Sequence, residues 1–133
     1  MPDWRRHIIV AIMLGACCSL APRLSLAEEI PQKIASEEAR KLALLATGEV
    51  SLEYDGPSKY DQFFVFEALG PEAGSSFFKV NPWTGDVWDE WGCKKLSTPG
   101  LRKLQAKIRQ RFTKDELKEY QKLRKIRPEC VTD

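Results

Sequence analysis

Apolar residues recur at helical spacing in a stretch that precedes the first strand pattern. They fall at positions i, i+3, i+4 and i+7 and give one apolar face. These positions are Ala39, Leu42, Ala43 and Ala46. Ser36 is the expected N-cap, and Gly48 is a typical C-terminal stop. The pattern therefore predicts a helix over residues 37–47.

The period then changes to two, which is typical of β-strands. Apolar and polar residues alternate over 50–54, and a dense aromatic run follows at 62–69. A third strand is expected at 77–81, and a fourth strand or hairpin arm at 86–89. Residues 55–58 have the composition of a turn. The middle of the chain thus predicts a small antiparallel sheet of three to four strands.

Helical spacing returns near the C-terminus. Residues 101–112 and 114–126 each carry apolar residues on one side. Thr113 and Glu116 match a capping box between the two helices, and Pro128 ends the second. A helix, a sheet and two further helices predict an α+β fold.

The first residues resemble an export signal. Arg5 and Arg6 precede thirteen uncharged residues, 8–20, a run too short to span a membrane. Ser25 and Ala27 match an A-x-A-like cleavage site. We expect residues 1–27 to be a signal peptide, and 28–133 to be a single periplasmic or secreted domain.

A second form of export is also compatible with this segment. Leu14 to Cys17 resembles a lipobox, in which the cysteine is lipidated and becomes the first residue of the mature protein. Cleavage after Ala27 and lipidation at Cys17 are alternatives, and both place the domain outside the cytoplasm.

Cleavage after Ala27 leaves two cysteines, Cys93 and Cys130. An even pair in an oxidising compartment predicts a disulfide. Closing a loop of this length stabilises a fold by about 3–4 kcal/mol in the chain-entropy picture.

The scarcity of histidine restricts the chemistry that the protein can perform. His7 is the only one, and it lies in the segment expected to be removed. Without histidine, a Ser-His or Cys-His nucleophile pair and the usual catalytic zinc site are excluded, and no metal or cofactor is expected. A carboxylate-based hydrolase remains as an alternative, with Asp86, Asp89 and Glu90 as candidates, although such a cluster is more typical of a solvated sheet edge.

Charge is divided unevenly along the chain. Residues 28–92 hold 5 basic and 13 acidic residues, whereas residues 93–133 hold 13 basic and 5 acidic ones. Basic tracts can bind nucleic acid, but export argues against that partner. Lys103, Lys107 and Arg111 recur every four residues and form a stripe on one helix side. This stripe is expected to be exposed to an acidic protein or envelope surface; pairing within the molecule is the alternative.

Three tryptophans lie within nine residues: Trp83, Trp88 and Trp91. Tryptophan is favoured at interface hot spots, so Trp83 and Trp91 are candidate contacts for a protein partner. Packing in a small core is the competing interpretation, and it is preferred for Trp88, which alternates with Asp89.

The chain contains a strand, a V-(D/N)-P-x-T-G turn and a returning strand, formed by Val80, Asn81, Pro82, Thr84, Gly85 and Val87. With this pattern, residues 33–89 resemble a PepSY-type domain. Proline and glycine suit such a reversal because one presets φ and the other accepts a positive φ. PepSY domains are linked to extracytoplasmic peptidase inhibition and to protease propeptides. The resemblance implies a non-enzymatic binding or inhibitory module; an envelope-associated protein with basic helices is the alternative.

Overall fold

The computed structural model describes residues 30–49, 51–70 and 75–131. The expected signal peptide, with Cys17 and the cleavage site after Ala27, lies outside the described residues, as does Val50. The described elements, in chain order, are α2 (Ser36–Thr47), β1 (Glu53–Pro57), β2 (Phe64–Leu69), β3 (Ser75–Val80), β4 (Val87–Asp89), β5 (Lys94–Leu96), α3 (Pro99–Arg109) and α4 (Lys114–Lys125).

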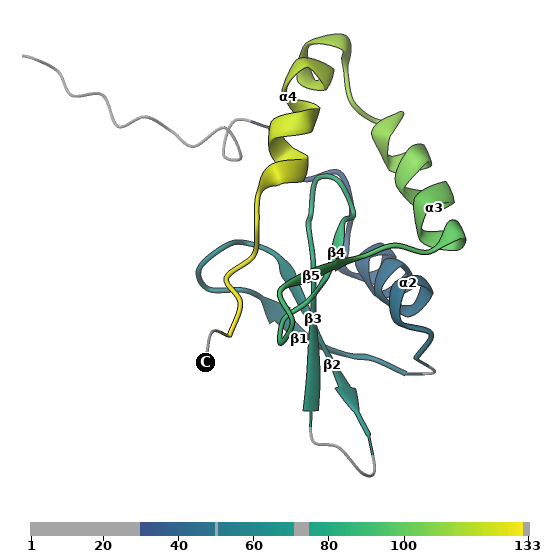
Figure 1. Cartoon of the computed structure of the whole chain (residues 1–133). Coiled ribbons are helices and arrows are strands. Elements are labelled where there is room, and N and C mark those ends of the chain that lie inside the picture. Colours follow the sequence, from purple (N-terminus) through teal and green to yellow (C-terminus); the bar gives the residue numbers. More distant parts are fainter. Residues whose placement is uncertain (1–29, 50, 71–74, 132–133) are drawn as a thin grey trace, which may run out of the picture.

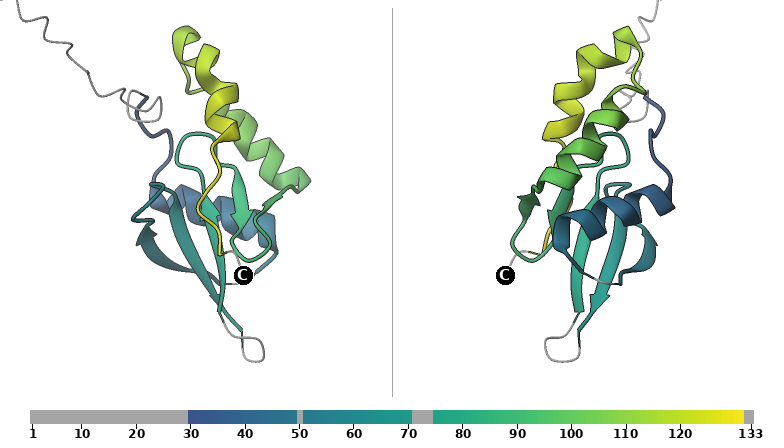
Figure 2. Two further views of the ribbon diagram at one scale, coloured as in Figure 1. Left: turned by 60° about the vertical axis from the view of Figure 1, so that its left-hand side comes forward. Right: turned by 90° about the vertical axis from the view of Figure 1, so that its right-hand side faces the viewer.

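The strands form one antiparallel meander in the order β1-β2-β3-β4-β5. The predicted α+β fold is confirmed, with one strand more than expected. Helix α2 lies across one face of the sheet, while α3 and α4 form a helical hairpin beyond one end of it (Figures 1 and 2). None of the helices in the described segments is long and apolar enough to cross a membrane.

Most of the core lies between α2 and the sheet, and it continues to Leu101, Ile108 and Leu123 of the C-terminal helices. Phe66 pairs with Phe78, and Val80 pairs with Val87, so alternate residues of the central strands face the helix. The apolar face of α2 buries Ala39, Leu42 and Ala43, as its spacing predicts.

The β3–β4 turn is packed into this core. Gly85 has φ +72°, and a Cβ there would lie 2.9 Å from Ile108 Cδ1 and 3.0 Å from a Leu42 Cδ. Glycine is therefore required both for the backbone conformation and for the close approach of α2 and α3.

Two details of α2 and β1 differ from the predictions. The N-cap of α2 is Ala35, without a side-chain hydrogen bond, and Ser36 is the first helical residue. The first strand runs through Gly56 to Pro57, because a bulge between Tyr54 and Gly56 absorbs the turn-like residues. As Pro57 ends an edge strand, its missing N–H costs no ladder hydrogen bond.

Strand β5 was not predicted. It contains only Lys94, Lys95 and Leu96, too few residues to show an alternating pattern. It forms because the chain reverses after β4, where Cys93 adopts φ +44°, and pairs back on that strand.

The C-terminal helices begin at side-chain caps. Thr98 Oγ1 accepts from Leu101 N at 3.2 Å, so α3 starts at Pro99, earlier than predicted. The predicted capping box is present: Glu116 N donates to Thr113 Oγ1 at 3.2 Å, and Thr113 N donates to Glu116 Oε2 at 2.7 Å. The capping box therefore starts α4 as a helix separate from α3.

Candidate functional site

The sheet face opposite α2 carries the second set of alternating side chains. Val65 pairs with Lys79, and Lys79 pairs with Trp88, so the three form a row across β2, β3 and β4. We call residues 126–131 the C-terminal strap; it runs from the end of α4 back along this side of the molecule (Figure 1). The strap covers part of the face and leaves the β1 side open.

Trp88 lies beneath the strap. Arg127 and Lys95 place their charges 5.9 and 5.2 Å from its ring centroid, and the side chain is 5% exposed. Packing is therefore the role of Trp88, in agreement with the interpretation preferred from the sequence.

A disulfide attaches the strap to the β4–β5 turn. Cys93 and Cys130 are bonded, with their Cα atoms 5.6 Å apart, as the cysteine count predicted. Such a bond is typical of an oxidising compartment.

Polar contacts fix the strap at a second point. Buried Lys79 donates from Nζ to the Glu129 carbonyl oxygen at 2.6 Å. The same ammonium lies 3.4 Å from Asp61 Oδ2 and 3.6 Å from Glu90 Oε1. One cation thus joins the strap, the β1–β2 turn and the residue after β4, so these three segments form one rigid unit.

Asp61 binds the strap from the other side. Its Oδ2 accepts from Glu129 N at 2.7 Å, and its Oδ1 accepts from Phe63 N at 3.0 Å. Burial by itself would raise the pKa of Asp61, but hydrogen bonds from Ser58 and the two backbone N–H groups, with the charge of Lys79, leave the pKa lowered. The ionised carboxylate is therefore the form that fits this site.

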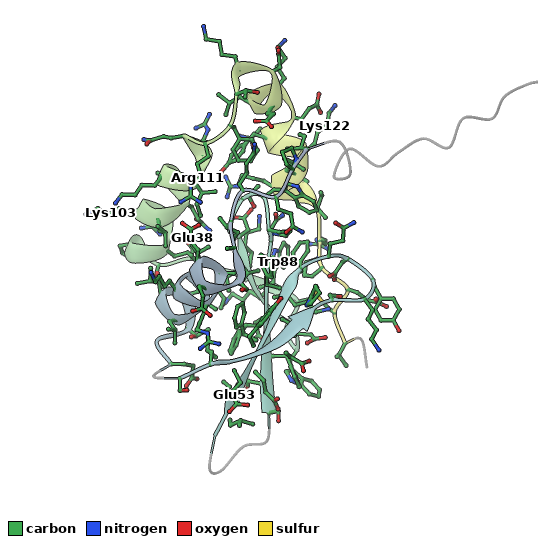
Figure 3. The ribbon with its side chains drawn as sticks, turned by 180° about the vertical axis from the view of Figure 1, so that it is seen from behind. Glu38, Glu53, Trp88, Lys103, Arg111 and Lys122 are labelled. Carbon is green, nitrogen blue, oxygen red and sulfur yellow. A yellow bond between two sulfur atoms is a disulfide. The ribbon has the colours of Figure 1, made fainter. Side chains whose placement is uncertain are left out.

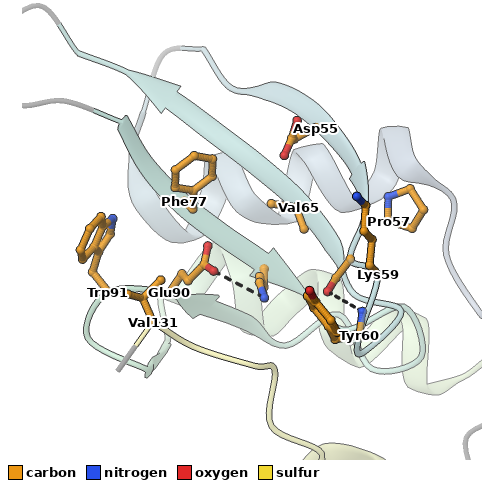
Figure 4. Close-up of a pocket in the computed structure, with 11 residues that line it drawn as sticks. Asp55, Pro57, Lys59, Tyr60, Val65, Phe77, Glu90, Trp91 and Val131 are labelled. Carbon is orange, nitrogen blue, oxygen red and sulfur yellow. Dashed lines mark hydrogen bonds and ion pairs between the residues drawn. The ribbon is translucent and has the colours of Figure 1, made fainter. Parts of the chain in front are cut away.

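A groove of about 510 Å³ lies beside the strap on the open part of the sheet (Figure 4). Val65 and Phe77 of the sheet form part of its floor. Three exposed apolar side chains also line it: Tyr60 (81% exposed), Trp91 (57%) and Val131 (45%). These come from the β1–β2 turn, the β4–β5 turn and the strap, which Lys79 and the disulfide hold together.

Trp91 is placed in the groove as a candidate contact residue, whereas Trp83 is not. Trp83 is only 1% exposed and donates from Nε1 to the Ile30 carbonyl at 2.7 Å. The expectation that Trp83 contacts a partner is wrong, because the turn that carries it folds into the core and does not project into solvent. Tyr60 and Val131 were not anticipated; an aromatic within a polar turn is the signal that could have indicated Tyr60.

The turn residues Asn81, Pro82, Thr84 and Gly85 have the predicted structural role. Asn81 Oδ1 accepts from the backbone N–H groups of Trp83 and Thr84, at 2.9 and 3.1 Å. Its Nδ2 donates to the Leu123 carbonyl at 3.1 Å, so the turn also holds α4.

The candidate carboxylates of a hydrolase each make stabilising contacts. Asp86 is 2% exposed, and its Oδ2 lies 3.2 Å from Lys95 Nζ and 3.4 Å from Arg124 Nε. Asp89 accepts from Trp91 N at 3.1 Å, and Glu90 pairs with Lys79. Their positions favour a structural role. Among the described residues there is no cluster of histidine, cysteine or carboxylate side chains able to hold a metal ion.

The three residues of the basic stripe, Lys103, Lys107 and Arg111, differ in their contacts. Lys103 and Lys107 are exposed on α3, as predicted. Arg111 instead binds Glu38 through two hydrogen bonds of 2.6 Å and donates to the Lys33 carbonyl (Figure 3). The hydrogen bond to Glu38 raises the pKa of Arg111. Arg111 is therefore a contact between the α3–α4 connection and α2, but its side chain remains 42% exposed, so its availability to an external surface stays a prediction.

Comparison with known proteins adds one observation. No protein-family model matches the chain, and no curated protein matches it. It is similar to one chain of a solved type VI secretion system effector–immunity complex from Pseudomonas protegens, with 21% identity, a TM-score of 0.46, and coverage of 68% of this chain and 88% of that chain. At this TM-score the similarity carries no argument about function.

Proposed function

We propose that this protein is a small, exported, non-enzymatic binding module that holds a protein partner at the groove beside the strap. The supporting observation is the exposure of Tyr60 and Trp91 on a groove built from rigidly connected segments. Tyrosine and tryptophan offer a large contact area at a low cost in conformational entropy, which makes them the typical anchors of protein interfaces.

The local structure around both aromatics favours this role. Asp89 Oδ1 accepts from Trp91 N, and the disulfide begins two residues later at Cys93. Tyr60 lies next to Asp61, which accepts hydrogen bonds from Glu129 N of the strap and from Phe63 N, just before β2. Because the backbone of each aromatic is already ordered, binding would cost little further loss of backbone freedom.

The resemblance to PepSY domains supports an extracytoplasmic peptidase as the partner. In this proposal the protein occupies the periplasm or the cell exterior, and the disulfide is consistent with that location. The groove side chains would contact the peptidase surface, and the domain would inhibit it or hold it without catalysing a reaction.

A photo-crosslinking residue in place of Lys59, on the groove rim, tests the proposal in the native host. The same residue in place of Leu117, which is exposed on α4, is the matched control. We expect the Lys59 position to capture one protein and the Leu117 position not to capture it. Inhibition of that protein's peptidase activity tests the finer proposal.

Affinity for the captured protein then tests the aromatic anchors. The double variant Tyr60→Ala/Trp91→Ala is expected to bind at least about tenfold more weakly, while Leu117→Ala binds as the wild type does. Unchanged affinity in the double variant would place the interface elsewhere.

A further inference from the structure

A second concave surface lies between α3 and α4. It is an open cleft of about 240 Å³. The two helices that carry its lining residues form the hairpin at one end of the molecule (Figure 2). Polar residues from both helices line it: Arg102, Gln105, Arg109, Tyr120, Gln121 and Arg124. This cleft is separate from the groove beside the strap and shares none of the groove's lining residues.

Helical spacing explains why these side chains meet. Arg102, Gln105 and Arg109 lie at i, i+3 and i+7 on α3, which is one face of the helix. Tyr120 and Arg124 lie at i and i+4 on α4. The stripe of Lys103 and Lys107 occupies a different side of α3 and does not line the cleft.

The cleft concentrates positive charge. Three guanidinium groups line it, and its lining includes no carboxylate. The charge of Arg124 is already paired, because its Nε lies 3.4 Å from Asp86 Oδ2. The same Asp86 oxygen lies 3.2 Å from Lys95 Nζ. One buried carboxylate therefore faces two cations.

Arg102 and Arg109 are both exposed and have only neutral contacts in the described structure. Arg102 donates to Ser97 Oγ at 2.9 Å, and the Arg109 guanidinium lies 5.2 Å from the Tyr120 ring centroid. The aromatic ring supports the Arg109 side chain without neutralising it. Both guanidinium groups thus keep donors and charge available at the cleft.

We propose that this cleft binds a phosphate group through Arg102 and Arg109, with Gln121 as a neutral donor beside them. The planar guanidinium donates two parallel N–H groups to an oxyanion, and several such donors around one site match a group with three terminal oxygens. Asp86 holds Arg124 at the floor of the cleft and so maintains its shape. The phosphate group belongs either to a small soluble anion or to a lipid headgroup.

Titration of the purified protein with inorganic phosphate, at an ionic strength held constant with sodium chloride, tests the proposal. Saturable shifts of the Arg102 and Arg109 side-chain NMR signals are expected. The variant Arg102→Gln/Arg109→Gln should bind at least about tenfold more weakly. Lys103→Gln/Lys107→Gln removes the same charge from the same helix and should bind within about threefold of the wild type.

Folding is checked by thermal melting. All four substituted side chains are exposed, so both variants should melt within about 4 °C of the wild type. A loss of binding with an unchanged melting temperature then reports on the cleft.

Flotation with phosphatidylcholine vesicles, with and without phosphatidic acid, distinguishes a small soluble anion from a lipid headgroup as the source of the phosphate group. Saturable binding of inorganic phosphate that depends on the arginines supports a soluble anion. Retention on phosphatidic acid vesicles that depends on the arginines, without binding of inorganic phosphate, supports a headgroup. Equal losses in the arginine and lysine variants, or no arginine-dependent binding to either probe, overturn the proposal.

Discussion

Lys79 and Asp61 illustrate how single residues organise the open face of the sheet. Both are largely inaccessible, and each contacts Glu129 of the strap, one through its carbonyl and the other through its N–H. A buried cation is stable only when its donors are satisfied, and Lys79 reaches a carbonyl and two carboxylates. The strap position is therefore set by charged hydrogen bonds as well as by the disulfide.

The lowered pKa of Asp61 predicts a specific acid sensitivity. A carboxyl whose pKa is lower in the folded state stabilises that state above its unfolded pKa, about 3.9, and the contribution is lost as the pH falls through the folded pKa. The unfolding free energy of Asp61→Asn should therefore fall less than that of the wild type between about pH 5 and pH 2. Urea unfolding at a series of pH values measures this difference. Parallel pH profiles for the two proteins would contradict the role given to Asp61.

At the scale of elements, the strap and strand β5 depend on each other. Strand β5 has three residues, and the disulfide begins at the residue before it. The strap has no regular secondary structure among its described residues, and it covers Trp88 from one side. Its order therefore rests on tertiary contacts.

Removal of the disulfide is expected to loosen the strap before the rest of the fold. The variant Cys93→Ser/Cys130→Ser should lose about 3–4 kcal/mol of unfolding free energy, because the bond closes a long loop in the unfolded chain. Hydrogen exchange should increase at Glu129 N and in β5, while α2 and the β2–β3 pair keep their protection. If Glu129 N stays protected in the variant, the contacts of Lys79 and Asp61 alone hold the strap.

Across the whole molecule, the helical hairpin is joined to the sheet and α2 by ion pairs of unequal burial. Arg111 pairs with Glu38 at a partly exposed site, whereas Arg124 of α4 pairs with buried Asp86, which also pairs with Lys95 of β5. The basic and acidic halves of the chain thus pair within the molecule at these points and leave Arg102 and Arg109 available.

The Arg111–Glu38 pair and the ion pairs of Asp86 should differ in their contribution to stability. Glu38→Gln is expected to cost less than about 1 kcal/mol, and the cost should shrink with added salt. Asp86→Asn should cost about 2–4 kcal/mol with little dependence on salt, because it leaves two cations around a buried neutral side chain. Urea unfolding at low and high salt measures both. Equal costs for the two substitutions would contradict the assigned difference in burial.

The sequence alone was sufficient for the features that depend on near neighbours. The apolar face of α2, the Thr113 capping box and the Asn81–Gly85 turn each rest on contacts within a few residues, so their residue types reveal them. The Cys93–Cys130 pairing was also predictable, because the expected cleavage after Ala27 would leave no other cysteine.

Only the tertiary structure decided which residues reach the surface together. The strap brings Val131 beside Tyr60 and Trp91, and the hairpin of α3 and α4 brings Arg102 near Arg124. The same folding buried Trp83 and paired Arg111 with Glu38. These outcomes depend on contacts between residues distant in the chain, and a local pattern of apolar and charged residues does not specify which distant segment will cover a side chain.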